Sequence, residues 1–385
     1  MIVRYPSYYD KFQCIAGACE DTCCAGWEID IDDETYEAYM QVEGEFGERL
    51  RRMIKEYHFE EDECYESHGF CLKENRRCAF LDDNNLCEIY RELGEDALSY
   101  VCTHTPRNYL EYGGAREIAI SVSCPEAGRL IFGSQEKMCQ MEKEIHGEPD
   151  YKETEEELIQ AATIRRMRDE AIALLQNRHK SMDRRMDEML QYAEAAQGVL
   201  NREAWDEKVR WQNTEQPTPE QGEIYHHFLG RMKSYTQLAS INERWEQQLI
   251  ALQERYLEAA DGQEAYGNER GAFGKFMEQE KREIWLEQLA VYYAFMCLPR
   301  SVDGLDFLGQ AKFVATSYLM IEDMAMCLYA KIKDKFNLES FSAVARIYAK
   351  EVEHSEENLD FLAEEILFEE IFEVGKLREC FVALP

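Results

Sequence analysis

The second half of the chain carries the apolar pattern of amphipathic helices. Between Glu155 and Ala195 apolar side chains recur at a spacing of about 3.6 residues, and the segment contains no glycine or proline. The prolines at 217, 219 and 299 indicate breaks between helices. The same periodicity predicts further helices over 199–212, 219–262, 273–298, 305–333, 339–353 and 357–374. We therefore expect residues 151–385 to form an all-helical domain.

The first half has short alternating runs separated by turn residues. Residues 29–32 alternate as a strand does, and a helix is predicted to begin at about Asp33. Apolar residues flank an Asp-Asp-Asn-Asn turn between Cys78 and Cys87. This pattern predicts a hairpin that holds the two cysteines at its base.

A second hairpin is predicted in residues 107–123. Its turn falls at Gly113 and Gly114, and apolar residues alternate along the returning strand. Pro125 suits the first turn of a helix that runs through Leu130. We therefore predict a mainly α protein, in which a small cysteine-rich α+β domain (1–146) precedes the all-helical domain. The change of composition at 146–150 marks the boundary.

Composition supports a folded protein. Hydrophobic residues make up 45% of the 385 residues and aromatic residues 12%, so disorder is a poor description of the chain. The first ten residues contain no apolar run typical of a leader. No window approaches the roughly 18 or more apolar residues that are needed to cross a bilayer. We expect a soluble, cytoplasmic protein that does not enter a membrane.

The formal net charge of −34 narrows the range of partners. Acidic residues outnumber basic ones in both halves, so the acidity does not come from a terminal tail. Nucleic acid is excluded as a partner because its binding requires clustered cations. A partner that presents lysines would be attracted, although acidity that serves only solubility explains the same number.

Eight cysteines in the first 124 residues carry the strongest chemical signal. The first four form a C-x4-C-x3-C-C cluster. Thiols gathered in this way in a reducing compartment favour metal ligation over disulfide bonds. The predicted metal ligands are therefore Cys14, Cys19, Cys23, Cys24, Cys78, Cys87, Cys102 and Cys124.

The spacing leaves the metal open. Cys19 and Cys23 share a face if they lie on a helix, whereas the adjacent Cys23 and Cys24 point in different directions. A multi-iron cluster or two neighbouring sites would use both of them more naturally than a single ion. Four thiolates suit either a [4Fe–4S] cluster or zinc, and neither the paired C-x2-C of zinc sites nor a ferredoxin spacing is present. An apolar core rich in cysteine is the alternative without a metal.

Other candidate ligands stand apart from these eight. Cys64 and Cys71, with His68 between them, are either ligands or loop residues, and His104 is either a ligand or a surface histidine. Four further cysteines lie in apolar surroundings and are expected to be core thiols: Cys139, Cys297, Cys327 and Cys380.

Residues 9–32 resemble the beginning of the bacterial flagellin lysine-N-methylases. The resemblance continues in the segment 78–87, in 93–107, which contains Cys102 and Arg107, and in 121–127 around Cys124. A wider group of small zinc- or iron-chelating proteins has a C-x-x-C-x-x-C-C core, from which the spacing here departs. The resemblance covers about the first 130 residues, and the helical remainder is similar in length and character only.

The resemblance implies a protein lysine methyltransferase that acts on flagellin or another lysine-bearing protein. It also implies S-adenosylmethionine as the methyl donor and a [4Fe–4S] cluster held by four of the eight cysteines, with zinc as the alternative metal. It does not indicate which four, nor the catalytic residues or the oligomeric state.

The residues permit this chemistry without a radical. No C-x3-C-x2-C radical motif and no G-x-G-x-x-G nucleotide loop occur, so a direct displacement on a fold other than the Rossmann fold is expected. Arg107 is a candidate partner for a carboxylate or the cofactor. The residues that follow the first cysteine cluster are candidates for a pocket that receives the lysine, or otherwise core and loop residues: Trp27, Asp30, Asp32, Tyr36 and Tyr39.

Two other functions are compatible with the same residues. The chain could be a non-enzymatic zinc- or iron-binding protein whose helical domain binds a partner. Alternatively, a cluster could serve redox chemistry or iron delivery. Methyl transfer from a labelled donor separates the first hypothesis from these two.

Overall fold

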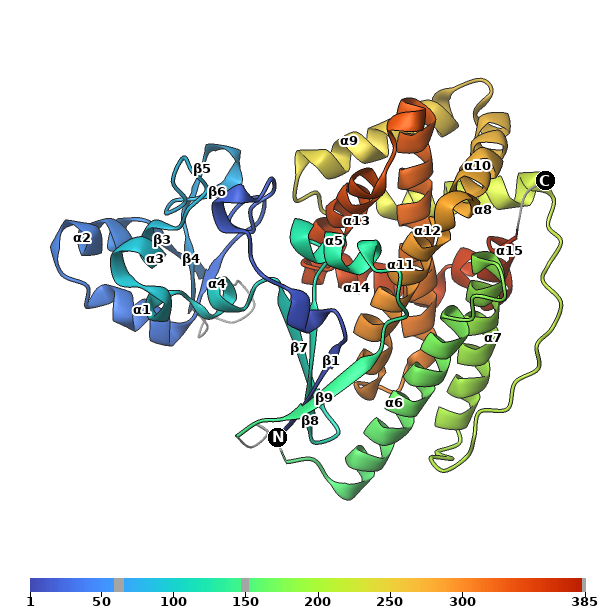
Figure 1. The fold of residues 1–385 in the computed structure, drawn as a ribbon, viewed down its shortest axis with the longest axis horizontal. Coiled ribbons are helices and arrows are strands. Elements are labelled where there is room, and N and C mark those ends of the chain that lie inside the picture. The colour runs from blue at the N-terminus through green and yellow to red at the C-terminus, as the bar shows by residue number, and fades with distance from the viewer. Residues whose placement is uncertain (59–65, 147–151, 383–385) are drawn as a thin grey trace. The chain divides into compact units, whose positions relative to one another are not determined.

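The structure is a computed structural model that describes residues 1–58, 66–146 and 152–382. Its chain divides into two compact units (Figure 1). The helical unit contains Met1–Phe12, Tyr109–Ser123 and Ala127–Pro385, and the cysteine-rich unit contains Gln13–Asn108 and Cys124–Glu126. This division differs from the predicted boundary at 146–150, of which residues 147–151 lie outside the described residues.

The reason for the difference is a four-stranded sheet that joins the N-terminus to the helical unit. Strand β1 (Ile2–Pro6) pairs in parallel with β8 (Ala115–Ile120) and antiparallel with β9 (Gln140–Glu144). Strand β7 (Arg107–Tyr112) completes the order β7-β8-β1-β9. The predicted hairpin in 107–123 is confirmed. Gly113 and Gly114 both have positive φ in its turn, which suits the twist of a two-residue hairpin loop.

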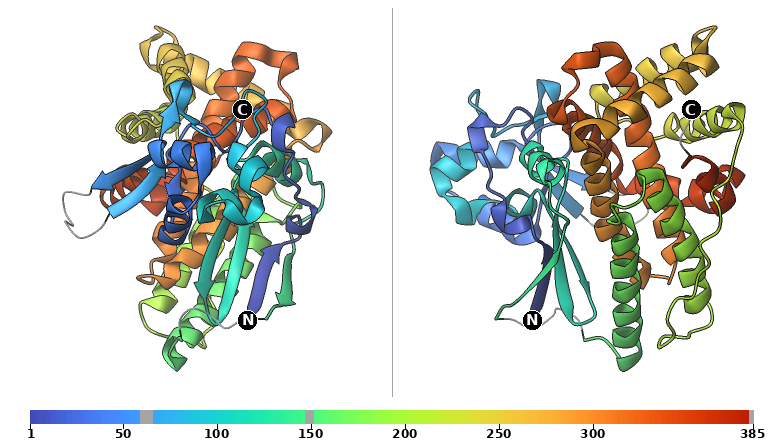
Figure 2. Two further views of the ribbon diagram at one scale, coloured as in Figure 1. Left: turned by 90° about the vertical axis from the view of Figure 1, so that its left-hand side faces the viewer. Right: turned by 45° about the vertical axis from the view of Figure 1, so that its right-hand side comes forward.

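Ten helices of the helical unit follow this sheet in the described residues. The central one is α12 (Phe307–Ile332), which packs against α7, α10, α11, α13 and α14 (Figures 1 and 2). It is buried on nearly every face along its first five turns, which explains why its sequence is apolar almost all round. The others are α6 (Glu155–Leu175), α7 (Met182–Leu200), α8 (Gln221–Tyr235), α9 (Glu243–Leu252), α10 (Gly262–Glu278), α11 (Glu283–Cys297), α13 (Leu338–Val352), α14 (Glu356–Phe368) and α15 (Val374–Glu379).

Several predicted helices are shorter than expected because polar side chains cap them. The stretch 155–195 is two helices, since the Ser181 side chain accepts the Arg184 N–H and begins α7. The helix predicted over 219–262 is likewise interrupted, since Asn242 caps α9. The helix predicted over 199–212 is wrong. Beyond Leu200 the chain leaves the helical conformation. Its Trp205 carbonyl accepts a hydrogen bond from the Thr163 hydroxyl on α6 at 3.0 Å.

Helix α12 and the residues that follow it form a segment apolar and long enough to cross a membrane. Two-thirds (67%) of its most apolar window is buried inside the protein. Burial of this extent is what the core helix of a soluble protein shows. The expectation of a chain without a long apolar stretch is therefore corrected at 307–335.

The cysteine-rich unit is small and mixed. Its three-stranded sheet has the order β2-β4-β3 and is flanked by short helices around one apolar core that includes Tyr39, Leu50 and Phe80. The predicted strand at 29–32 and the helix from Asp33 are confirmed. The elements are β2 (Asp30–Ile31), β3 (Ile54–His58), β4 (Glu66–Phe70), β5 (Leu72–Lys73), β6 (Arg77–Cys78), α1 (Asp33–Met40), α2 (Gly44–Arg52), α3 (Glu88–Leu93) and α4 (Tyr100–His104). The predicted helix after Cys124 is α5 (Pro125–Gly133).

The hairpin predicted between Cys78 and Cys87 is present in a modified form. Leu81, not Cys78, lies opposite Cys87, and Cys78 pairs with Leu72 instead. The Asp82 carboxylate accepts the backbone N–H groups of residues 84 and 86 and so tightens the turn. Because the loop is shorter than predicted, the residue opposite Cys87 lies three positions after Cys78.

One buried ion pair fastens the sheet to the helices. Arg168 on α6 is 2.5 Å from Glu117 on β8, and both side chains are almost fully buried (0% and 4% exposed). Tyr112 on β7 also donates to Glu117 at 2.7 Å, and Arg168 donates to Gln140 on β9. The pair therefore connects α6 to three strands of the sheet.

Replacement of Arg168 by Met is expected to lower the free energy of unfolding by about 3–5 kcal/mol, because Glu117 would remain as an unpaired buried charge. The matched control is Arg202→Met, which removes an exposed ion pair with Glu207 and should cost at most about 1 kcal/mol. Urea unfolding followed by circular dichroism measures both. Equal effects of the two substitutions would contradict the assigned role of Arg168.

Candidate functional site

All eight cysteines predicted as metal ligands fall in the cysteine-rich unit. Gln13–Asn108 contains seven of them, and Cys124–Glu126 returns the eighth to the same unit although the residues on either side belong to the helical unit. The four cysteines predicted as core thiols lie in the helical unit. Two of those, Cys297 and Cys380, are buried, Cys327 is partly buried and Cys139 is exposed. No described cysteine forms a disulfide.

Four of the eight thiols line one small cavity. Cys24, Cys78, Cys87 and Cys102 surround a space of about 20 Å³, which is room for one water-sized group. The remaining walls are apolar, formed by Ile29, Tyr39, Phe70, Phe80, Leu81, Ile89 and Leu98. Residues separated by up to 78 positions in the sequence therefore bring sulfur to one place in the core of this unit.

Backbone contacts place each of these thiols. The Cys78 N–H donates to the Cys24 carbonyl at 2.8 Å, so the two residues lie on adjacent segments. Cys87 is held opposite Leu81 and precedes the first turn of α3. Cys102 lies in the first turn of α4, where its N–H donates to the capping Ser99 hydroxyl at 3.4 Å. Local backbone contacts therefore fix the positions of these cysteines.

The other four thiols lie outside this cavity. Cys14 and Cys23 are exposed, and Cys19 and Cys124 are partly buried. Cys23 lies near enough to Cys102 to contribute to the raised pKa of that thiol, after burial as the main cause. The adjacent Cys23 and Cys24 therefore face different surroundings, one toward solvent and one toward the cavity.

Burial keeps two of the cavity thiols, Cys78 and Cys102, protonated. It raises the pKa of Cys78 to about 12 and that of Cys102 to about 11. A thiolate is the form that binds metal, so a cation that entered the cavity would have to displace these protons. Metal affinity should consequently rise with pH through the neutral range.

The four cavity cysteines are suitable ligands for a metal that prefers sulfur. Their side chains do not, however, converge on one point in this structure. In residues 1–58, 66–146 and 152–382, no three His, Cys, Asp or Glu side chains converge closely enough to hold an ion. Four thiols in one apolar cavity are the donors that both zinc and iron–sulfur clusters take.

The aromatic and acidic residues that follow the first cysteines have structural contacts. Asp32 accepts the N–H groups of Thr35 at 3.0 Å and Tyr100 at 2.7 Å, and so caps α1 and ties it to α4. Tyr39 is buried and donates to the Ala97 carbonyl at 2.6 Å. Tyr36 stacks on His68 with ring centroids 3.5 Å apart. These contacts match the alternative interpretation of these residues as core and loop residues, and their role in a lysine pocket stays a prediction.

The remaining sequence candidates are dispersed. Trp27 donates to the Cys23 carbonyl at 2.9 Å, and Asp30 is an exposed residue of β2. His104 is partly buried and its Nδ1 contacts the Tyr100 carbonyl at 2.8 Å. Arg107 begins β7. Cys71 is partly buried, and Cys64 lies outside the described residues.

A much larger cavity lies in the helical unit, where sequence reasoning placed no site. Its volume is about 690 Å³, within the range of roughly 300–1,000 Å³ that is usual for small-ligand sites. Helix α8, the short 3-10 helix η9 (Glu370–Phe372) and α15 form its walls. The lining residues are Gly222, Glu223, His226, His227, Leu229, Gly230, Glu370, Ile371 and Lys376. The adjacent histidines in a predicted helix were the only signal of it in the sequence.

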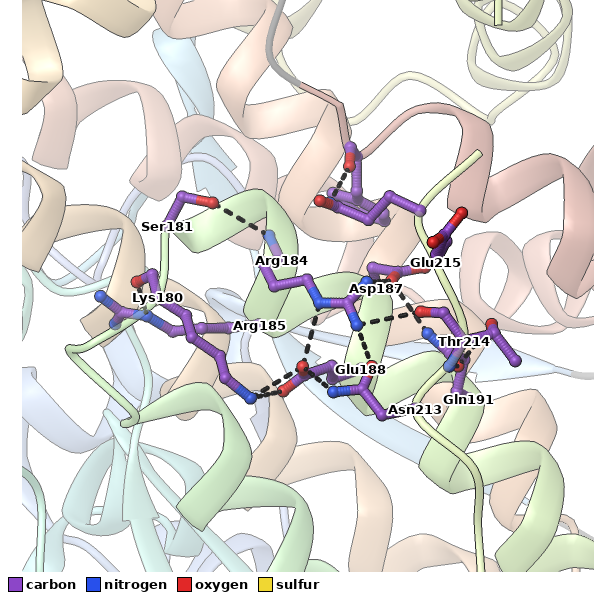
Figure 3. Close-up of polar contacts among 12 residues, drawn as sticks. Lys180, Ser181, Arg184, Arg185, Asp187, Glu188, Gln191, Asn213, Thr214 and Glu215 are labelled. Atoms are coloured by element: carbon purple, nitrogen blue, oxygen red, sulfur yellow. Dashed lines mark hydrogen bonds and ion pairs between the residues drawn. The ribbon is translucent and has the colours of Figure 1, made fainter. Parts of the chain in front are cut away.

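Two buried acids on α7, Glu188 and Asp187, are held in ion pairs. Glu188 on α7 contacts Lys180 at 2.7 Å and Arg184 at 3.0 Å, and it accepts from Asn213 at 2.7 Å (Figure 3). Asp187 next to it contacts Arg184 and Arg378, at 2.9 and 2.6 Å. These carboxylates tie α7 to the 213–215 segment and to α15.

Comparison with known proteins gives a match to one family model and matches to individual proteins. A family model described as the FliB lysine N-methylase C-terminal domain matches residues 168–378, which is more than half of the chain. A lysine-N-methylase of Salmonella typhimurium is 30% identical over 146 residues, which are 37% of this chain and 35% of that protein. The flagellar biosynthetic protein FliU of Salmonella muenchen is 28% identical over 147 residues, which are 37% of this chain and 83% of that protein.

These matches extend the resemblance seen in the sequence. The alignment spans about a third of the Salmonella lysine-N-methylases, while the family model covers helices that resembled the family only in character. The 690 Å³ cavity lies within the matched segment. No solved structure matches the chain.

Loss of one cavity thiol is expected to reduce metal loading strongly. Cys102→Ser should lower the metal content of anaerobically purified protein at least about tenfold, because serine is a poor ligand for soft or borderline metals. Cys139→Ser, which changes an exposed thiol of the helical unit, should leave the metal content unchanged. Elemental analysis measures both. Full loading of the Cys102→Ser protein would exclude this cavity as the metal site.

Proposed function

This chain belongs to the FliB lysine N-methylase family, and from that membership we propose that it is a protein lysine N-methyltransferase acting on flagellin. The observation that carries the proposal is the family match over 168–378. The names of the relatives support the same activity and a flagellar context. The proposed methyl donor is S-adenosylmethionine.

The charge of the chain agrees with such a substrate. A net charge of −34 favours the approach of a protein segment that presents lysine. The reaction needs a deprotonated amine held in line with the methyl carbon of the donor, since proximity and alignment supply much of the rate. It also needs a group that accepts the proton of the lysine ammonium.

The metal belongs to the cysteine-rich unit in this proposal. Cys24, Cys78, Cys87 and Cys102 would hold it, because they are the thiols that share one apolar cavity. A [4Fe–4S] cluster, or zinc in its place, would supply a fixed charge and cross-links within a small unit. Free thiols at this density also fit the reducing cytoplasm as the place of action.

The direct test is methyl transfer. Protein purified under anaerobic conditions is incubated with methyl-labelled S-adenosylmethionine and flagellin, and label is expected on lysine side chains by mass spectrometry. Flagellin with its amines chemically blocked serves as the control and should remain unlabelled.

Absence of transfer by fully metal-loaded protein would contradict the proposed activity. If that protein were also colourless, zinc-loaded and without affinity for S-adenosylmethionine, the chain would instead be a non-enzymatic metal-binding protein.

A further inference from the structure

The 690 Å³ cavity of the helical unit has a buried histidine in its wall. His227 on α8 is only 7% exposed, and its Nε2 atom lies 2.9 Å from the Glu379 carboxylate on α15. An ionised carboxylate can only accept a hydrogen bond, so Nε2 carries the proton of the neutral ring. The other ring nitrogen, Nδ1, is then the atom with the free lone pair.

The Nδ1 atom is the unusual feature of this cavity. It is buried, and within the described parts of the chain it has no hydrogen-bond partner. A buried polar atom without a partner is costly, so its presence beside a cavity indicates a ligand that supplies the missing hydrogen bond. The ligand atom that would satisfy this lone pair is a donor, such as the N–H of an amine.

The electrostatics of the pair favour a neutral imidazole that can take up a proton. Burial lowers the pKa of His227 and outweighs the opposing hydrogen bond to Glu379. Burial alone would raise the pKa of Glu379, but the hydrogen bonds from His227 and Lys376 outweigh it and lower that pKa. At neutral pH the pair is therefore a neutral imidazole held by a carboxylate, which is the arrangement of a general base.

The rim of the cavity is suited to a cationic side chain on a protein. Glu223 and Glu370 are exposed at the rim, where they attract positive charge. Leu367 and Phe368, three and two residues before the start of η9, are also exposed, by 66% and 77%. Adjacent exposed apolar residues are typical of a surface that contacts another protein.

A glycine controls the shape of the wall. At Gly230 a Cβ atom would overlap the terminal methyl group of Ile371 on η9, so a larger residue would require the Ile371 side chain to move. The close approach of η9 brings Glu370 and Ile371 to the same cavity as His227.

We propose that this cavity receives the ε-amine of a substrate lysine and that Nδ1 of His227 accepts the proton that the amine must lose. The inference rests on the proposed methyltransferase function and names its catalytic base. The substrate is a lysine on a protein surface, and the co-reactant is a sulfonium methyl donor.

The reaction balances with these groups. The lysine ammonium gives one proton to Nδ1 of His227. Its nitrogen lone pair then attacks the methyl carbon of the sulfonium donor, so that an N–C bond forms while the S–C bond breaks. The sulfur keeps the electron pair of the broken bond and becomes a neutral thioether. The imidazolium, stabilised by Glu379, later releases its proton to solvent.

The test is the pH dependence of methyl transfer in the His227→Gln variant. At about pH 7 its kcat should fall by about 10²–10⁴-fold, the usual contribution of a general base. The deficit should shrink toward about pH 10, because an unassisted lysine loses its proton near its own pKa of about 10.4. The control, His179→Gln, changes an exposed histidine outside the cavity and should match the wild type at every pH.

The other charged groups near His227 are Glu379 and Lys376 on α15, Arg231 on α8, and Glu223 and Glu370 at the rim. The His227→Gln substitution leaves all of them in place. A deficit that is equal at about pH 7 and pH 10, or full activity of His227→Gln, overturns the proposal.

A second variant keeps the test decisive if His227→Gln does not fold. Glu370 is exposed, so Glu370→Gln should fold normally. It should raise the KM for flagellin several-fold with little change in kcat, because it weakens the attraction of the lysine without touching the base. An unchanged KM in that case overturns the proposal.

A binding measurement separates this inference from the proposed function. The ring nitrogen resonances of His227 in ¹⁵N-labelled wild type are followed by NMR while Nα-acetyl-lysine methylamide is added, and the Nδ1 signal is expected to shift. A shift in a protein that transfers no methyl group would support the amine site and contradict the methyltransferase. A shift with S-adenosylmethionine alone, and none with the amine, would overturn the amine site even in an active enzyme.

Discussion

The burial of four cysteine side chains in one apolar cavity is the constraint on which the cysteine-rich unit depends. Cys24, Cys78, Cys87 and Cys102 come from separate short elements, and the walls between them are aromatic and aliphatic. A unit of about one hundred residues has a limited core of its own. The thiols therefore occupy positions that larger apolar side chains would otherwise fill, which is consistent with a group that binds between them.

The raised pKa values of Cys78 and Cys102 follow from the same burial. Protonated thiols in an apolar space behave as small hydrophobic groups. A cation would exchange the protons for metal–sulfur bonds and cross-link the separate elements that carry the four cysteines. Metal binding would in that way stabilise the folded cysteine-rich unit.

The helical unit supplies a different kind of environment. Its cavity is open at the rim, with exposed carboxylates, and its wall includes a histidine whose proton is positioned by Glu379. Elsewhere in this unit α12 is buried on most sides, and the Arg168–Glu117 ion pair ties the sheet to α6. The cysteine-rich unit thus contains a cavity lined by thiols. The helical unit contains a cavity with a histidine in its wall, which we propose as a base.

The sequence predicted the helices and the grouping of the cysteines, but not the division of the chain or the second cavity. Periodicity identified α12 and α13 nearly to their ends, since their apolar faces are long. It missed the breaks before α7 and α9, which depend on single capping side chains. The parallel pairing of β1 with β8 joins residues more than one hundred positions apart, and local patterns carry no trace of such a contact. His227 and Glu379 are 152 positions apart and meet only in the folded chain.

X-ray absorption at the metal edge of the anaerobically purified protein tests the central claim most directly, since it reports the atoms bound to the metal. The account predicts a first shell dominated by sulfur, with distances near about 2.3 Å for zinc or with the iron–iron scattering of a cluster. A first shell of nitrogen and oxygen, or protein that contains no metal when prepared without oxygen, would contradict it.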